Sequence, residues 1–174
     1  MRLFVAINFS EGTIKRLASQ RDELRINSKS GNFTLTENLH LTLAYIGECN
    51  VKQASSIKSV MEAINFEPFE ITINRIGRFE REFGEIWWAG LGECKPLFSL
   101  QRDLSDRLID AGFDLEKRAY SPHITIGRKV VSSMKPHNIN TIQEQVSSID
   151  LMKSGRISGK LTYTSIYTRN CQNI

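Results

Sequence analysis

Apolar positions along the chain form short runs typical of strands, separated by longer stretches in which they recur every three or four residues. The short runs predict strands over 3–7, 39–46, 69–79, 85–91, 124–126 and 160–169. The three- and four-residue spacing predicts helices over about 11–24, 53–64 and 96–111, with a short helix over 142–146.

Strands and helices therefore alternate, but the pattern does not favour a parallel sheet. The strands 69–79 and 85–91 flank Gly84 and predict a β-hairpin, which joins antiparallel strands. We therefore expect an α+β fold with largely antiparallel sheets flanked by helices. Its 174 residues, with no linker-like or repeated segment, fit one domain, 1–174, or two intimate lobes.

Composition excludes several classes of protein and leaves others open. With 40% hydrophobic and 24% charged residues, the chain is neither disordered nor fibrous. The apolar run at 3–7 is shorter than a signal peptide or a membrane span requires, so we expect a cytoplasmic protein. A net charge of +4 permits a polyanionic partner such as RNA, and Lys153, Arg156 and Lys160 form one of its basic groups.

Neither the cysteines nor the common nucleotide-binding and hydrolase motifs indicate a function for this chain. Cys49, Cys94 and Cys171 lie far apart and form no C-x-x-C pair, so neither a disulfide framework nor a zinc site is expected. The sequence contains no P-loop and no G-x-S-x-G motif, so it lacks the signatures of P-loop proteins and of serine hydrolases.

Two tetrapeptides carry the chemical signal: His40-Leu41-Thr42-Leu43 and His123-Ile124-Thr125-Ile126. Two of three histidines followed by Thr at the second position should arise by chance about one time in a hundred. In a strand, side chains alternate between faces, so each His and Thr share one face while the apolar residues enter a core. Each strand is followed by a glycine, which we expect to end it. The structural alternative is that both histidines are half-exposed strand residues, but strand propensity gives no reason for histidine to occur twice in this pattern.

Two imidazoles with pKa values near ~6.5 can supply a general base and a general acid together near neutral pH. Two hydroxyls beside them can donate hydrogen bonds to phosphate oxygens, so displacement at phosphorus could proceed without a metal. A metal site is the alternative use of histidines, but each motif brings one strong ligand and no carboxylate or cysteine partner. We therefore expect no metal and no cofactor. His137 lacks the motif and is expected in a surface loop.

Through these motifs the chain resembles the 2H phosphoesterases, and among them the RNA 2′,3′-cyclic phosphodiesterases, also called 2′-5′ RNA ligases. The resemblance spans the opening 1–7, the segment 37–47, the run Ile86-Trp87-Trp88-Ala89-Gly90, and 120–128. It implies a bilobal, pseudo-twofold fold in which each lobe gives one His-x-Thr strand to a central cleft. It also implies that an RNA 2′,3′-cyclic phosphate is opened to a 2′-phosphate without metal.

The resemblance further implies roles for single residues. His40 would be the proton donor to the leaving 3′-oxygen, His123 the proton acceptor from water, and Thr42 and Thr125 the ligands of the phosphate oxygens. The sequence alone does not decide which imidazole is which, because two interacting groups titrate as a pair.

Two further residues are candidate substrate-binding groups. Arg128 is expected to bind the anion, although it lies five residues after His123, the wrong parity for the same face unless a bulge intervenes at Gly127. Tyr45 stands at the same offset from His40 and could stack a base, alone or with Phe9 or Tyr120, although packing is the alternative.

The expected partner is therefore an RNA or oligonucleotide with a 2′,3′-cyclic phosphate end, bound by a monomer away from any membrane. Two alternatives remain. One is another 2H activity, on a small cyclic nucleotide or on 2′-5′ linkages, including their ligation. The other is a noncatalytic module that binds RNA ends.

Overall fold

A computed structural model describes residues 1–172 as nine strands, three α-helices and one 3₁₀ turn. The strands are β1 (Arg2–Ile7), β2 (Ser28–Phe33), β3 (Leu41–Glu48), β4 (Phe69–Phe79), β5 (Glu85–Leu91), β6 (His123–Ser132), β7 (His137–Val146), β8 (Ser148–Ile157) and β9 (Lys160–Asn170). The helices are α1 (Glu11–Ile26), α2 (Val51–Glu62) and α3 (Lys95–Asp110), and the 3₁₀ turn is η1 (Thr36–Asn38).

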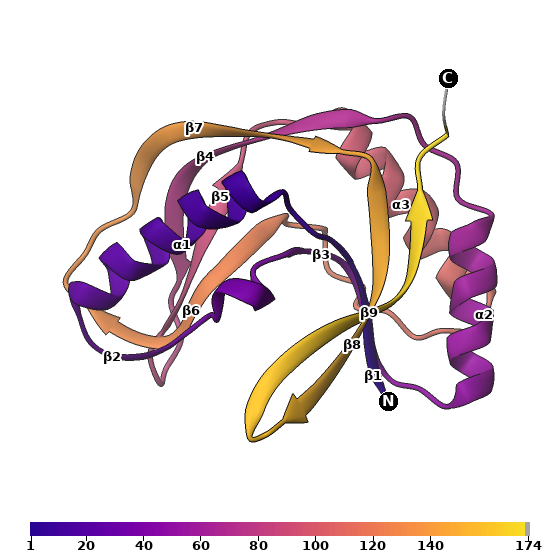
Figure 1. The fold of residues 1–174 in the computed structure, drawn as a ribbon, viewed down its shortest axis with the longest axis horizontal. Helices are drawn as coiled ribbons and strands as arrows, with labels where there is room; N and C mark the ends of the chain where they lie inside the picture. Colours follow the sequence, from indigo (N-terminus) through magenta and orange to yellow (C-terminus); the bar gives the residue numbers. More distant parts are fainter. Residues whose placement is uncertain (173–174) are drawn as a thin grey trace.

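The strands form two sheets, one in the order β3-β1-β8-β9 and the other in the order β2-β6-β5-β4-β7. Every strand pair is antiparallel, which confirms the predicted α+β class. Helix α1 packs against the five-stranded sheet, whereas α2 and α3 lie beside the four-stranded sheet (Figure 1). The two His-x-Thr segments lie in different sheets, at the start of β3 and of β6.

The chain passes repeatedly between the two sheets. After β1 it enters α1 and β2 on the five-stranded side, returns for β3 and α2, and crosses again for β4 and β5. One continuous cluster of buried apolar side chains includes residues of both sheets. Since no single cut separates the sheets, we propose that they fold as one domain of two lobes; residues 173–174 of the predicted span lie outside the described residues.

Local signals explain where the helices begin. Ser10 caps α1, its hydroxyl accepting a hydrogen bond from the backbone N–H of Thr13. Helix α2 begins two residues before the predicted position, because Asn50 and Gln53 form a reciprocal capping box. Helix α3 starts with a proline in its first turn and buries four leucines at helical spacing, as predicted.

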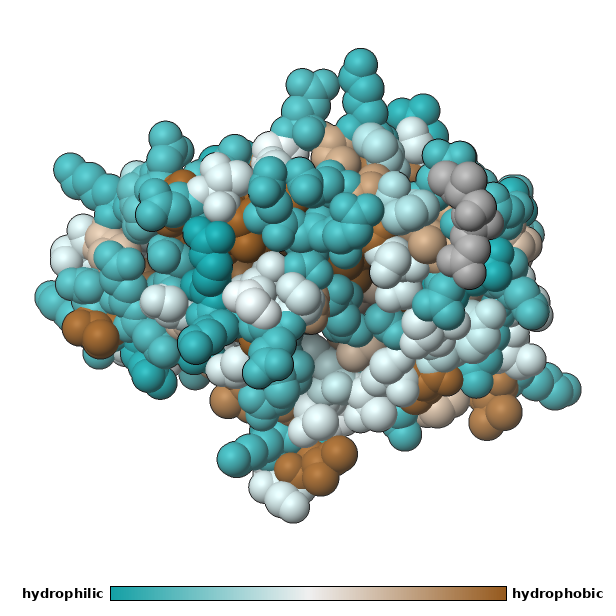
Figure 2. All heavy atoms as spheres, turned by 45° about the horizontal axis from the view of Figure 1, so that its top comes forward, coloured by the Kyte–Doolittle hydropathy of each residue, from teal (hydrophilic) through white to brown (hydrophobic). Residues whose placement is uncertain are grey.

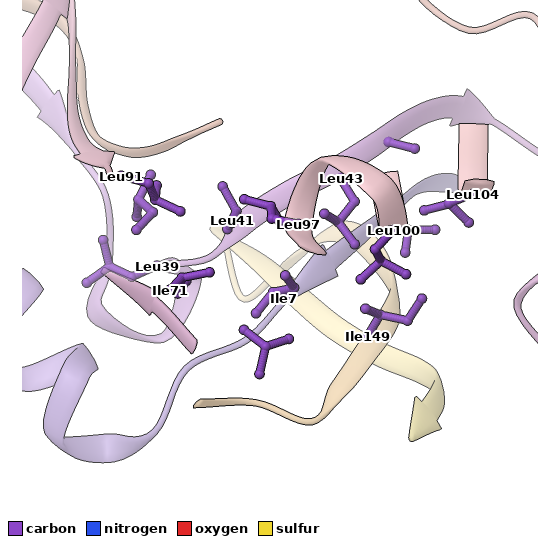
Figure 3. Close-up of a cluster of buried hydrophobic side chains, with 14 of the residues drawn as sticks. Ile7, Leu39, Leu41, Leu43, Ile71, Leu91, Leu97, Leu100, Leu104 and Ile149 are labelled. Carbon is purple, nitrogen blue, oxygen red and sulfur yellow. The ribbon is translucent and has the colours of Figure 1, made fainter. Parts of the chain in front are cut away.

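The apolar residues of the first His-x-Thr strand anchor it in the core. Leu41 and Leu43 are buried and lie beside Leu97 and Leu100 of α3 (Figure 3). In the second strand, Ile124 and Ile126 are fully buried as well. Each strand is therefore fixed by its apolar face, which gives the His and Thr side chains a rigid support.

The predicted short helix over 142–146 is wrong: these residues belong to β7. Ile142, Glu144 and Val146 are buried at the strand period of two. Because the middle position is the acidic residue Glu144, the sequence did not show this alternation of buried positions. Its carboxylate is satisfied by Ser10, whose backbone N–H and hydroxyl each donate a hydrogen bond of 2.8 Å. Strands β2 and β8 were also not predicted, β2 because it contains no hydrophobic residue before Phe33.

The outer surface is mostly hydrophilic, and hydrophobic side chains are scattered over the face in Figure 2 without forming one continuous patch. Across residues 1–172, no helix combines the length and apolar character that a membrane span requires.

Candidate active site

A pocket of about 430 Å³ lies where the two sheets face each other. It brings together all six candidate residues named from the sequence: both histidines and both threonines of the motifs, together with Tyr45 and Arg128. The remaining lining residues are Arg2, Phe4, Thr34, Asn38, Ser154, Leu161 and Tyr163.

Matching bulges in β3 and β6 explain how Tyr45 and Arg128 reach this pocket. In β3, Thr42 and Ala44 pair with consecutive residues of β1, so Leu43 is an inserted residue. In β6, Thr125 and Gly127 pair with consecutive residues of β5, so Ile126 is inserted in the same way. An inserted residue reverses the alternation of faces beyond it. The fifth residue after each histidine therefore turns toward the cleft.

The expectation that glycine ends each strand is wrong. Strand β3 runs one residue past Gly47, and β6 continues five residues past Gly127 to Ser132. Gly127 instead allows close packing, because a Cβ atom there would lie 2.8 Å from a methyl group of Val130.

The imidazole of His40 is held on both sides. Its Nδ1 lies 2.7 Å from the backbone oxygen of Asn38, and its Nε2 lies 3.0 Å from the hydroxyl oxygen of Thr42. Since a carbonyl oxygen only accepts, Nδ1 carries a proton and Nε2 faces the hydroxyl. The ring packs at 5.0 Å from Phe4 and edge-on at 5.2 Å from Tyr163.

The imidazole of His123 repeats this arrangement from the other sheet. Its Nδ1 lies 2.8 Å from the backbone oxygen of Ser121, again two residues earlier, and Phe79 contacts the ring edge-on at 5.2 Å. The carbonyl again fixes the proton on Nδ1, so Nε2 is the atom left to act in the pocket. Both histidines thus have the same tautomer and the same kind of aromatic support.

The electrostatics of the pocket favour the neutral form of both imidazoles. Burial is the main cause that lowers the pKa of each histidine, because it disfavours the charged imidazolium. The positive charge of Arg128 lowers both pKa values further. Hydrogen bonds from Nδ1 to the carbonyls of Asn38 and Ser121 oppose the shift. The positive charge of Arg128 therefore acts on both imidazoles, and an anionic ligand bound in the pocket would offset that charge.

The aromatic candidates differ in their surroundings. Tyr45 is 58% exposed at the rim of the pocket, open to a ligand. Tyr120 instead donates its hydroxyl hydrogen to the backbone oxygen of Thr42 at 3.0 Å, and burial raises its pKa. Thr34 donates to the backbone oxygen of Thr125 at 2.9 Å, so each motif strand is tied by a side chain from elsewhere in the chain.

Sequence reasoning missed Asn38, which is 4% exposed and lines the pocket. Its side-chain amide donates to the backbone oxygen of Leu161 at 2.8 Å and accepts from the backbone N–H of Tyr163 at 3.3 Å. Phe4, Phe79 and Tyr163 were also missed, since nothing local links them to a histidine. Asn38 had a signal: it precedes His40 by two residues, as Ser121 precedes the second motif's histidine.

His137 lies elsewhere, next to α1, and lines a separate groove with Arg16 and Asn138. Its Nδ1 also lies 3.0 Å from the carbonyl two residues earlier, that of Lys135. Within residues 1–172, no three side chains of His, Cys, Asp or Glu gather as metal ligands would.

Comparison with known proteins identifies the family and supports the fold. The 2′-5′ RNA ligase superfamily matches residues 15–153, so the chain belongs to that superfamily, as the paired motifs indicated. A relative from Aeropyrum pernix, named RNA 2′,3′-cyclic phosphodiesterase, is 30% identical over 152 residues, covering 81% of this chain and 86% of that protein. One from Methanothermobacter thermautotrophicus, with the same name, is 28% identical and covers 89% and 83%.

Solved structures agree on the fold. Escherichia coli LigT complexed with 3′-AMP aligns with a TM-score of 0.86 at 21% identity, covering 99% of this chain and 98% of that one.

Proposed function

We propose that the chain hydrolyses RNA 2′,3′-cyclic phosphate ends to 2′-phosphomonoesters, using two histidines and no metal ion. The observation that carries this proposal is the pair of imidazoles from different sheets, each with Nδ1 bound to a carbonyl and Nε2 left for the shared pocket. The curated relatives named RNA 2′,3′-cyclic phosphodiesterase support the enzyme class.

The reaction would proceed by attack of water on phosphorus. Nε2 of His123 accepts a proton from the water, whose oxygen forms the new bond to phosphorus. The bond from phosphorus to the 3′-oxygen breaks, and the 3′-oxygen takes a proton from Nε2 of His40. The products are a 3′-hydroxyl and a 2′-phosphate, and the two histidines have exchanged protonation states.

The assignment of acid and base has one structural support. His40 is the more deeply buried of the two, between Phe4 and Tyr163, whereas His123 is the more accessible to a water nucleophile. The 3′-oxygen, which belongs to substrate held in the pocket, is better placed than solvent water to exchange a proton with the enclosed imidazole of His40. We therefore keep His40 as the proton donor and His123 as the proton acceptor.

Thr42, Thr125 and Arg128 would bind the phosphate. The hydroxyls donate to the nonbridging oxygens, and the guanidinium balances the charge that builds up as water attacks. The phosphate would also change the acid. Its negative charge offsets the repulsion from Arg128 and raises the pKa of His40, which favours the charged imidazolium that donates the proton.

A turnover assay on an oligoribonucleotide with a 2′,3′-cyclic phosphate end tests this proposal. We expect turnover to persist in EDTA and the product to carry a 2′-phosphate, identified by phosphorus NMR. Loss of turnover in EDTA with recovery on adding Mg²⁺ or Mn²⁺ would contradict metal independence. Binding without turnover would favour the noncatalytic module.

Alanine variants test the two histidines. His40→Ala and His123→Ala should each slow the chemical step by roughly 10²–10⁴, the usual contribution of one general acid or base. His137→Ala is the matched control, because its ring makes the same bond to a preceding carbonyl but lies outside the pocket. An equal loss in His137→Ala would mean that the site is misplaced.

A further inference from the structure

The end of the β8–β9 hairpin projects beyond the body of the molecule, at the bottom of Figure 1, and it carries hydrophobic as well as hydrophilic residues (Figure 2). The strands stay paired to Ile157 and Lys160. Ser158 and Gly159 form the tight turn, both with positive φ. Ile157 and Leu161 are 59% and 40% exposed, so the projecting end presents apolar side chains to solvent.

One face of this hairpin continues the floor of the pocket. Ser154 pairs with Arg2 on β1 and with Tyr163 on β9, and all three line the pocket. Two residues further along β8, on the same face, Arg156 pairs with Leu161. Arg156 is not part of the pocket lining, and it lies roughly 7 Å beyond Ser154 along the strand. Because its cross-strand partner Leu161 does line the pocket, Arg156 lies at the edge of the pocket.

Charge distinguishes this hairpin from the β4–β5 hairpin. Lys153, Arg156 and Lys160 are the charged residues of the segment 153–161, which has no acid. At the end of the β4–β5 hairpin three glutamates accompany two arginines, and Arg78 is paired with Glu85 at 3.0 Å. That hairpin also contributes nothing to the lining of the pocket. A polyanion leaving the pocket is therefore attracted along β8–β9.

The hairpin is also fixed relative to the active site. The amide of Asn38 bonds the backbone of both Leu161 and Tyr163, and the carbonyl of Asn38 holds the imidazole of His40. Arg156 donates one hydrogen bond to the turn, to the oxygen of Gly159 at 2.9 Å, and its guanidinium has further N–H groups to offer. The surface is thus in place before a ligand arrives.

We propose that the pocket-side face of the β8–β9 hairpin binds the RNA chain on the 5′ side of the cyclic phosphate. Arg156 contacts a phosphodiester outside the pocket, and Leu161 and Tyr163 pack against ribose or base. This inference rests on the proposed function and names its substrate class: an oligonucleotide end, favoured over a cyclic mononucleotide. It adds a binding site beyond the residues that touch the reacting phosphate.

The test compares Arg156→Ala with Lys160→Ala. Both variants remove one positive charge from the end of the hairpin, but Lys160 pairs with Ile157 on the opposite face. The measured quantity is the ratio of kcat/KM for a hexanucleotide ending in a 2′,3′-cyclic phosphate to kcat/KM for the cyclic mononucleotide. The ratio should fall about three- to fivefold in Arg156→Ala and stay at the wild-type value in Lys160→Ala. An equal fall in both variants, or none in Arg156→Ala, would overturn the proposal.

Binding measurements separate this inference from the proposed reaction. Fluorescence anisotropy with a 5′-labelled hexanucleotide carrying a 2′-phosphate end needs no turnover. Arg156→Ala should weaken binding about three- to fivefold and reduce the slope of log K against log salt by about 0.7. Wild-type binding without hydrolysis would refute the proposed function, and this assay would still decide the role of the hairpin. Unchanged affinity and slope in Arg156→Ala would refute the hairpin site.

Discussion

Removal of the Asn38 side chain should weaken the fold and the site together. The amide is buried and bonds two outward-facing backbone groups of β9, which is an edge strand of its sheet. Asn38→Ala leaves the carbonyl of Leu161 and the N–H of Tyr163 without this partner. An unsatisfied buried group costs about 1–3 kcal/mol, so two groups at a partly hydrated edge should cost about 2–4 kcal/mol.

Urea unfolding followed by circular dichroism measures this loss, and thermal unfolding checks it, since each kcal/mol should lower Tm by about 2–4 °C in a chain of this size. The matched control is Asn140→Ala, an exposed asparagine on β7, which should change stability by less than about 0.5 kcal/mol.

The activity of the same variant provides a second readout. Asn38→Ala keeps the carbonyl that holds the ring of His40 but frees the segment that carries it. We expect kcat/KM on a cyclic mononucleotide to fall about ten- to hundredfold, because small displacements of a catalytic group are costly. A destabilisation below about 0.5 kcal/mol, or wild-type activity in a destabilised variant, would refute this account of Asn38.

Three further predictions concern the pocket itself. Burial and Arg128 lower the pKa values of His40 and His123, so the bell-shaped pH profile of kcat/KM should have its maximum below pH ~6.5. The maximum of the kcat profile should lie at higher pH, because the phosphate of the bound substrate raises the pKa values of both histidines. Coinciding maxima, with chemistry rate-limiting, would contradict this. Arg128→Ala should lower the rate and move both limbs of the kcat/KM profile to higher pH, since a repelling charge is gone; a shift to lower pH would be inconsistent with its position. Thr42→Val and Thr125→Val should lower kcat about 10²-fold and leave the shape of the profile unchanged, and the loss of one limb in either variant would assign that hydroxyl to proton transfer.

Repetition made the site recognisable in the sequence, since both motifs carry His and Thr with one apolar residue between them. The structure extends the repetition to a backbone carbonyl two positions before each histidine and an inserted residue after each threonine. A single motif would have read as an ordinary strand.

Local sequence determined the elements whose signals are contiguous. Helix α3 followed from proline at its start and leucines at helical spacing, and the β4–β5 hairpin followed from two apolar runs around Gly84. It also determined the six candidate residues that the structure gathers in one pocket. The helix and hairpin predictions were confirmed because each depends on residues within one element or on two neighbouring apolar runs, whereas the roles of the six residues stay predictions.

Tertiary structure decided what depends on partners far apart in the chain. Strand β7 was misread because Glu144 occupies a buried position that only Ser10, 134 residues away, makes tolerable. The aromatic rings against the two histidines come from β1, β4 and β9, and sequence spacing carries no record of those contacts. Local propensity and periodicity are set by neighbours along the chain, whereas burial, pKa and cleft geometry are set by neighbours in space, and only the folded sheets bring those together.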